Sequence, residues 1–348
     1  MLAELLRVVN IYLNNELETY QDGSWRAQRV HGGMNNALFR VEQANKTYAC
    51  KLCVPDERKR AEREYTALQL LERRGIDIAP RPVGIDCEAK IVPYPAVVYE
   101  WCEGKCLDPV KNGAELALLL DSLQKMHGCR PQPEGGPDVD PIRRAWFHWF
   151  NRQPYIWELA GFVVKYTPWL ERTGTEGRKL SRRLKKLVWR GSWRLTFMRV
   201  TLGWGAFPVC LCHVDPNATN AILGMDGRVR WVDWEYSGWG DPALDLAEYR
   251  WHMAYAGLSE AQQTWLRDSY QIPADDPNFG NRLVFWDSLL AVRWPFLVLR
   301  LLWSRANGDD RLRLSRLEGD KVELWDRLEW LVERAERFYN KPELNNLI

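Results

Sequence analysis

The residues best suited to chemistry gather in one stretch of the chain, residues 211–249. The residues of this stretch that suit a reaction centre are, in order, His213, Asp215, Asn220, Asp233 and Glu235. Phosphoryl transfer needs a cation held against phosphate oxygens, an oriented acceptor hydroxyl and compensation of charge in the transition state. Carboxylate and amide oxygens suit Mg²⁺, so Asn220 and Asp233 are predicted to hold this ion, with Glu235 as a further candidate ligand. Asp215 is predicted to accept the proton of the attacking hydroxyl or to aim that hydroxyl.

Two neighbouring features should place these groups. Residues 221–223 and 229–232 have a strand-like pattern around an Asp226-Gly227 turn, which predicts a hairpin. That hairpin would bring Asn220 and Asp233 together at its open end. His213, counted with Asp215 and Asn220 in the catalytic set, is expected to brace the loop through hydrogen bonds, and Asp245 is a candidate to tie the loop down.

The combined pattern resembles a known family. H-x-D-x-x-x-x-N, followed by D-W-E and then G-D-P-x-x-D-L-A, is similar to the signature of the aminoglycoside phosphotransferase and choline kinase group, relatives of the protein kinases. The resemblance implies an α+β, two-lobed protein-kinase-like fold with a small antiparallel sheet lobe and a larger helical lobe. It also implies ATP and Mg²⁺ as cofactors and a small-molecule hydroxyl acceptor as substrate.

The hydrophobic pattern supports that layout. The first twenty residues have the pattern of an amphipathic helix. Short strands separated by turn residues follow, and Arg58 to Arg73 has its apolar residues at helical spacing. The predicted strands cover residues 25–31, 37–42, 47–52, 83–86 and 96–100. The chain becomes mainly helical from Asp108, so we predict a nucleotide-binding lobe over residues 1–101 and a catalytic and acceptor-binding lobe over residues 102–348.

Candidates for the phosphate contacts follow from the resemblance. The family places a turn over the phosphates between the first two strands, where Gly33, Asn35 and Asn36 lie in this chain. Lys51, in the third strand, would neutralise the α- and β-phosphates. Glu64 of the following helix would hold this lysine, with Glu62 as the alternative.

The segment after the last strand resembles the hinge between kinase lobes. Backbone groups of Glu100 and Cys102 would then meet the adenine edge, with Tyr99 behind it. Side chains specify little in such a hinge, so ATP is expected by default and GTP stays open.

The acceptor is less well defined by sequence. Residues 178–199 contain nine Lys or Arg and no acidic residue, which would disfavour a polycationic acceptor if they faced the cleft. Their leucine spacing instead favours a solvated face. The Glu235-Tyr236-Ser237-Gly238 segment is similar to the choline and ethanolamine kinase version of the motif, and aromatic faces bind ammonium groups. An aminoglycoside-like antibiotic and an amino alcohol therefore both remain candidates.

Composition excludes other classes. A formal net charge of +2 favours neither a nucleic-acid nor a membrane partner, and the longest apolar run, Leu289 to Trp303, is interrupted by arginine and proline. The chain has eight cysteines, and Cys50, Cys53, Cys210 and Cys212 lie in apolar strand-like runs; with no secretory leader, this predicts reduced thiols and a cytoplasmic protein. A zinc site at Cys210, Cys212 and His213 lacks a completing pair. The remaining rival is an inactive kinase-fold binding module, and the oligomeric state, monomer or homodimer, is open.

Overall fold

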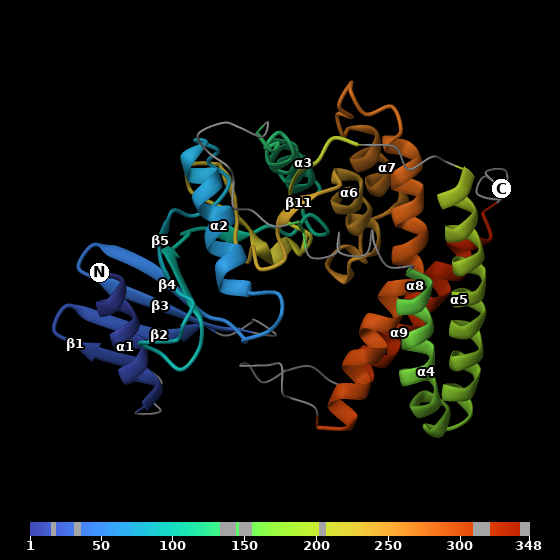
Figure 1. Cartoon of the computed structure of the whole chain (residues 1–348), viewed down its shortest axis with the longest axis horizontal. Helices are drawn as coiled ribbons and strands as arrows, with labels where there is room; N and C mark the ends of the chain where they lie inside the picture. Colours follow the sequence, from blue (N-terminus) through green and yellow to red (C-terminus); the bar gives the residue numbers. More distant parts are fainter. Residues whose placement is uncertain are drawn as a thin grey trace.

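The computed structural model describes residues 1–14, 19–30, 36–132, 144–145, 155–201, 207–308 and 321–341. They form a small sheet lobe at one end and a larger helical lobe at the other (Figure 1). This is the two-lobed α+β architecture predicted from the sequence. The predicted phosphate turn at Gly33 and Asn35 lies outside the described residues.

The sheet of the small lobe is antiparallel throughout. Its six strands have the order β1-β2-β3-β4-β6-β5. Their bounds are Thr19–Asp22, Trp25–Val30, Ala37–Gln43 and Lys46–Leu52 for β1 to β4, and Pro82–Asp86 and Ala96–Glu100 for β5 and β6. The predicted strands are therefore confirmed to within two residues.

The alternation of side chains along β4 decides where Lys51 lies. Tyr48 and Cys50 join the apolar cluster under helix α1, Leu2–Asn14. Ala49 and Cys53 instead join the cluster beneath helix α2, Arg60–Arg73, which continues into the helical lobe. Since successive side chains of a strand point to opposite faces, Lys51 shares the α2 face.

The predicted opening helix is too long. It ends at Asn14, and Thr19–Asp22 is strand β1. A turn at Gly23, whose φ of 55° favours glycine, folds β1 back onto β2 with Thr19 opposite Gln28. The pairing with β2 and not the local pattern decides the conformation of this segment.

The helical lobe contains two small sheets and long helices. Strands β7 (Lys105–Cys106), β9 (Ala221–Leu223) and β10 (Val229–Trp231) form one sheet, and β8 (Cys210–Cys212) pairs with β11 (Gly238–Gly240). The helices are α3 (Ala114–His127), α4 (Tyr155–Arg172), α5 (Thr175–Thr201), α6 (Pro242–Trp251), α7 (Glu260–Asp268), α8 (Phe279–Ala306) and α9 (Lys321–Tyr339). Helix α8 packs against α4, α5, α6 and α9 and is the centre of the lobe.

Two sequence interpretations are settled by this packing. The basic stretch at 178–199 lies in α5 with Leu180, Leu184 and Leu187 buried, and its exposed side chains include Arg178 and Lys186. The apolar run at 289–303 is part of α8, and no described helix is long and apolar enough to cross a membrane. All eight cysteines are free thiols.

Candidate active site

The backbone of the loop after β8 donates hydrogen bonds to one carboxylate. Asp245, at the start of α6, accepts the backbone N–H of His213 at 2.9 Å and that of Val214 at 3.0 Å. Val214 has a φ of 69°, an unfavourable conformation for a β-branched residue. These two hydrogen bonds fix the loop in that conformation and so determine where Asp215 stands.

His213 lies behind this loop. It is buried, its ring packs on Trp231 and Trp234 with centroids 5.1 and 4.7 Å away, and its Nε2 is 3.0 Å from the carbonyl oxygen of Val232. These contacts join the loop to the end of the hairpin. The geometry fits the bracing role expected of His213.

The hairpin brings Asn220 and Asp233 together as expected. Ala221 pairs with Trp231, and the N–H of Val232 donates to the carbonyl of Asn220 at 2.8 Å. The Asn220 Nδ2 donates to the Asp215 carbonyl at 3.4 Å, so the amide oxygen, which a hard cation would bind, is not the atom used in that bond. Asp233, partly exposed and with a φ of 67°, turns its carboxylate toward the sheet lobe. This pair of oxygen donors fits Mg²⁺.

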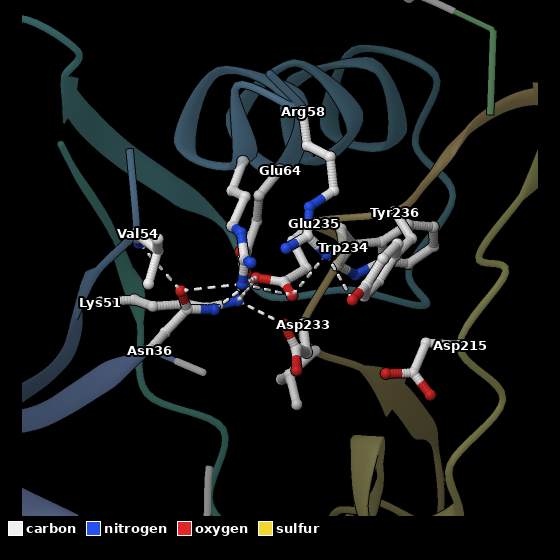
Figure 2. Close-up of polar contacts among 12 residues, drawn as sticks. Asn36, Lys51, Val54, Arg58, Glu64, Asp215, Asp233, Trp234, Glu235 and Tyr236 are labelled. Atoms are coloured by element: carbon white, nitrogen blue, oxygen red, sulfur yellow. Dashed lines mark hydrogen bonds and ion pairs between the residues drawn. The ribbon is translucent and has the colours of Figure 1, made fainter. Parts of the chain in front are cut away.

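Lys51 connects the two lobes at this point. Its Nζ lies 2.6 Å from Glu64 Oε2 on α2 and also bonds Asp233 of the helical lobe (Figure 2). Burial alone would lower the pKa of this lysine, but nearby carboxylates outweigh it and hold that pKa well above its usual value. These carboxylates belong to Asp233, Glu64 and Glu235. Lys51 is therefore a buried cation at the junction of the lobes.

Glu64, the partner expected for Lys51, is fully buried on α2. Burial raises the pKa of its carboxyl group to about 7, against the opposing charge of Lys51. Glu62, the alternative, is placed on the same helix but is not the residue that meets Lys51. The structure thus selects Glu64 from the two candidates.

Glu235 has a different environment from Asp233. It is buried, its carboxylate lies 3.0 and 3.3 Å from Nη1 of Arg60, and it also accepts a hydrogen bond from Asn36. Lys51 Nζ is 3.9 Å away. Its carboxylate is thus occupied by protein cations and an amide, and its role as a metal ligand remains a prediction.

Three arginines that sequence reasoning did not single out hold α2 against residues 235–237. Arg58 stacks over the ring of Tyr236 at 4.9 Å and donates to its hydroxyl. Arg60 pairs with Glu235, and Arg63 donates to the Ser237 carbonyl at 2.7 Å. Their Arg-x-Arg-x-x-Arg spacing at the beginning of α2 is the sequence signal that could have drawn attention to them. Because this helix also carries Glu64, the arginines fix the position of the partner of Lys51.

Asp215 stands apart from this ion-pair network (Figure 2). Its Oδ1 lies 3.4 Å from Nε2 of His252, which follows α6. The Nδ1 of His252 accepts the N–H of Ala254 at 3.2 Å, so the proton of the neutral ring is on Nε2 and points to Asp215. Burial raises the pKa of Asp215, but the hydrogen bond and charge of His252, the charge of His213 and the Asn217 N–H together outweigh it, and the pKa lies below its usual value.

His252 is the first of three side chains that contact one another in turn, followed by Trp294 and Glu248. The ring of His252 meets Trp294 of α8 edge-on at 4.8 Å, and the indole N–H of Trp294 donates to Glu248 at 2.8 Å. Burial raises the pKa of Glu248 to about 7. None of these three residues belonged to the predicted site.

The predicted hinge lies where β6 ends. Tyr99 is buried, Glu100 is the last residue of the strand and donates its N–H to the Arg81 carbonyl at 2.9 Å, and Cys102 is half-buried beyond it. Asn36, predicted with Gly33 and Asn35 to contact the phosphates, donates a hydrogen bond to Glu235. The hinge contacts of Glu100 and Cys102 remain predictions.

The cysteine–histidine cluster contains a different histidine from the one considered. Cys210, Cys212 and His127 are buried, with candidate ligand atoms within 4.8 Å of one another. The His127 nitrogens face Tyr270 at 2.8 Å and Asp245 at 3.3 Å, and burial raises the pKa of both thiols. Protonated thiols and an engaged imidazole are poor zinc ligands. Through His127, this cluster instead contacts Asp245, the residue that fixes the loop.

Comparison with known proteins agrees with this geometry. Residues 26–280 match the model of a family described as the phosphotransferase enzyme family. The chain belongs to this phosphotransferase family. Ethanolamine kinase 1 of Mus musculus is 26% identical over 199 residues, which cover 53% of this chain and 49% of that protein. The human ethanolamine kinase 1 is 25% identical over 201 residues, covering 53% and 40%. The chain spans about half the length of these curated relatives.

Solved structures of the phosphotransferase fold extend the comparison to nearly the whole chain. The spectinomycin phosphotransferase APH(9)-Ia, in complex with ADP and spectinomycin, has a TM-score of 0.60 at 16% identity and covers 96% of each chain. Choline kinase LicA from Streptococcus pneumoniae has a TM-score of 0.58 at 16% identity, covering 95% of this chain and 99% of that one. At such identities the likeness establishes the kinase-like fold of this phosphotransferase family member and leaves the substrate open.

Proposed function

We propose that this phosphotransferase transfers the γ-phosphoryl group of ATP to the hydroxyl of a small amino alcohol. The observation that carries the proposal is the position of Lys51, which bonds Glu64 within its own lobe and Asp233 across the junction. A fold maintained only as a scaffold has no need for a buried cation that bonds two carboxylates beside the loop of Asp215 and Asn220. The inactive-module alternative is therefore disfavoured.

The division of labour follows from the geometry. Asp215 Oδ1 is engaged by His252, so Oδ2 would accept the acceptor hydroxyl and its proton. The hydroxyl oxygen forms the new bond to the γ-phosphorus while the bond to the bridging oxygen breaks, which releases ADP. Lys51 would offset charge on the phosphates, and Glu64 keeps that ammonium group in place.

The donor set also fits the expected metal. Asn220 and Asp233 would hold Mg²⁺ through their side-chain oxygens, and the ion would supply electrostatic stabilisation of the phosphate oxygens. Lys51 bonds Asp233 in this structure. We assign Glu235 to positioning, because Arg60 and Asn36 occupy its carboxylate.

The acceptor side favours an ammonium group. Beyond Asp215 lie a buried carboxylate, Glu248, and an aromatic ring, Trp294. Carboxylates and aromatic faces are the groups that attract organic cations. The ethanolamine kinases and the choline kinase named above act on such amino alcohols. Most of the described basic side chains of α5 are exposed to solvent, which weakens the argument against a cationic acceptor.

The test is ADP release from Mg-ATP with ethanolamine, choline, spectinomycin and homoserine as acceptors, using the intact chain and Asp215→Ala. We expect release stimulated by an amino alcohol, and a loss of turnover by roughly 10²-fold or more in the variant with nucleotide affinity nearly unchanged. Full activity in Asp215→Ala would overturn the assignment of Asp215. Nucleotide binding with no turnover on any acceptor would instead favour the binding module.

A further inference from the structure

The helical hairpin α4–α5 has an exposed surface unlike the rest of the described chain. Ten large hydrophobic side chains of the described residues are exposed, and half of them lie on this hairpin. These five are Ile156, Trp157, Val164, Trp189 and Trp193. The tryptophans are 71%, 71% and 69% exposed in sequence order, although Trp is a residue that folded proteins mostly bury. Such a concentration indicates a surface that binds something.

The exposed residues of α5 follow one stripe. Arg178, Arg182, Lys186, Trp189 and Trp193 are spaced three or four residues apart, so they share a helix face, and leucines such as Leu180 and Leu184 fill the opposite, buried face. The stripe is basic in its first half and aromatic in its second. We call these five residues together with Trp157 the basic tryptophan face.

Helix α4 adds to the aromatic end of this face. The two helices pack side by side at the edge of the molecule away from the sheet lobe (Figure 1), and only residues 173–174 separate them in sequence. Helices joined this tightly run antiparallel, so Trp157, near the beginning of α4, is level with Trp189 and Trp193. The hairpin therefore has a basic end, at Arg178 and Arg182, and an aromatic end, at Trp157, Trp189 and Trp193.

The positive charge of the face is not cancelled by the hairpin itself. The acidic residues of α4 and α5 are already paired, Glu171 with Lys185 at 2.6 Å, Glu176 with Lys179 at 2.8 Å and Glu158 with Arg293 at 3.4 Å. Arg178 and Arg182 donate to neutral oxygens, the Thr175 hydroxyl at 3.1 Å and the Arg178 carbonyl at 3.3 Å. These two hydrogen bonds leave the guanidinium charges uncompensated.

We propose that the basic tryptophan face docks the protein on the surface of an anionic lipid bilayer. Tryptophan prefers the membrane–water interface, because its ring is apolar and its N–H needs a polar partner. Lys and Arg beside it would meet anionic headgroups. The predicted absence of a membrane partner would then hold for a spanning segment and not for surface docking. This inference goes beyond the proposed kinase activity and does not depend on it.

Two other occupants fit the face less well. A second copy of the chain packed symmetrically would set the same basic stripe against itself, which like charges oppose. A nucleic acid would match the charge, but Ile156 and Val164, the exposed aliphatic side chains of α4 outside the face as defined, offer nothing to phosphates or base edges. A bilayer interface accommodates both the charges and the aliphatic groups.

Sedimentation of the full chain with vesicles tests the proposal. Vesicles of phosphatidylcholine alone are compared with vesicles containing phosphatidylglycerol, at low and high salt. Trp189→Ser/Trp193→Ser and Arg178→Glu/Arg182→Glu are compared with matched controls, Trp265→Ser on α7 and Lys90→Glu/Lys111→Glu, all of exposed residues. We expect binding to anionic vesicles, weakened at least tenfold in the two face variants and unchanged in the controls, with all variants equally stable to heat.

Three results would overturn the proposal. Equal vesicle binding by the face variants and the controls would show that vesicles bind to another part of the protein. Absence of vesicle binding together with salt-sensitive binding of a short duplex would assign the face to nucleic acid. A dimer in light scattering that dissociates in Trp189→Ser/Trp193→Ser would assign it to a second copy. Kinase activity on a soluble acceptor is expected to be unchanged in all four variants, so failure here leaves the proposed function intact.

Discussion

The two ends of the active site are built on different principles. At the nucleotide end, Lys51 and Arg60 are matched by the carboxylates of Glu64, Asp233 and Glu235 in a buried network that spans both lobes. At the acceptor end, Asp215 and Glu248 are linked through His252 and Trp294. At the first end, buried cations and carboxylates already pair with one another before any ligand arrives. At the second, burial raises the pKa of Glu248 to about 7, and a cationic acceptor would favour its ionised form.

The comparison suggests why the ends differ. A triphosphate brings its own charge and metal, so the protein must hold a cation and an α2 helix in fixed positions for it. Arg58, Arg60 and Arg63 supply that rigidity through residues 235–237. An amino alcohol is small, and carboxylate attraction is the main way to select it. Substitutions at the nucleotide end should therefore impair nucleotide binding or stability, and those at the acceptor end should impair acceptor binding or turnover.

The largest effect is expected for Lys51→Ala at the nucleotide end. Removal of this ammonium group should lower kcat/KM for ATP by about 10²–10³-fold, since one preorganised charge facing the phosphates is lost. Isothermal titration with a non-hydrolysable ATP analogue measures the binding part of this loss. The matched control is Lys46→Ala, at the exposed beginning of the same strand. Unchanged nucleotide binding in Lys51→Ala would show that another lysine has this role.

Glu235→Gln should act on stability at the same end. The change leaves Arg60 buried without its main partner, and breaking such pairs costs about 3–5 kcal/mol. Asp56, 2.9 Å from Arg60, remains, so we expect about 3 kcal/mol in urea unfolding, partly recovered by adding Arg60→Met.

The same variant separates the two roles of Glu235. A positioning role predicts an unchanged Mg²⁺ requirement, whereas a metal ligand predicts that more Mg²⁺ is needed for half-maximal activity. A Mg²⁺ titration of the folded variant measures this. A large shift with unchanged stability would restore Glu235 to the metal site.

At the acceptor end, Glu248→Gln should raise KM for the amino alcohol by about tenfold, as expected for loss of one charged partner. Its folded pKa of about 7 lies above the unfolded value, so the folded state favours the protonated form and the ionised form lowers stability as pH rises from about 4.5 through 7. Glu248→Gln should therefore raise Tm by roughly 1–3 °C at pH 8 while it weakens acceptor binding.

The pH dependence gives a second check on Glu248. In the unsubstituted protein, acceptor KM should fall as pH rises through 7, because the carboxylate becomes charged. This dependence should be absent in Glu248→Gln. A KM profile identical in both proteins would remove Glu248 from the acceptor site.

The smallest effect is expected for His252. His252→Ala removes the donor to Asp215 Oδ1 and should lower kcat by roughly 3–10-fold with little change in nucleotide affinity. His252→Gln, which keeps an N–H donor, should recover most of the rate. Equal losses in both variants would indicate that the imidazole acts only through packing on Trp294.

The site residues whose proximity could be predicted are close to one another in sequence. Asn220 and Asp233 are thirteen residues apart, and a short hairpin with an Asp-Gly turn joins them, so local sequence fixes their proximity. Lys51 and Glu64 are likewise close in sequence, and strand alternation and helix spacing give their faces. The misplaced end of the first helix shows the limit, since β1 exists because it pairs with β2.

By itself the sequence determined strands β2 to β6 and helix α2 of the sheet lobe and the hairpin, because short-range periodicity and turn residues encode them. The residues expected to meet a nucleotide followed from the family resemblance and stay a prediction. Only the tertiary structure decided that Arg60 pairs with Glu235, that His252, Trp294 and Glu248 extend from Asp215, and that most basic side chains of α5 are exposed. Such contacts join segments tens to hundreds of residues apart, and no local pattern carries the information of which long-range partners the packed helices bring together.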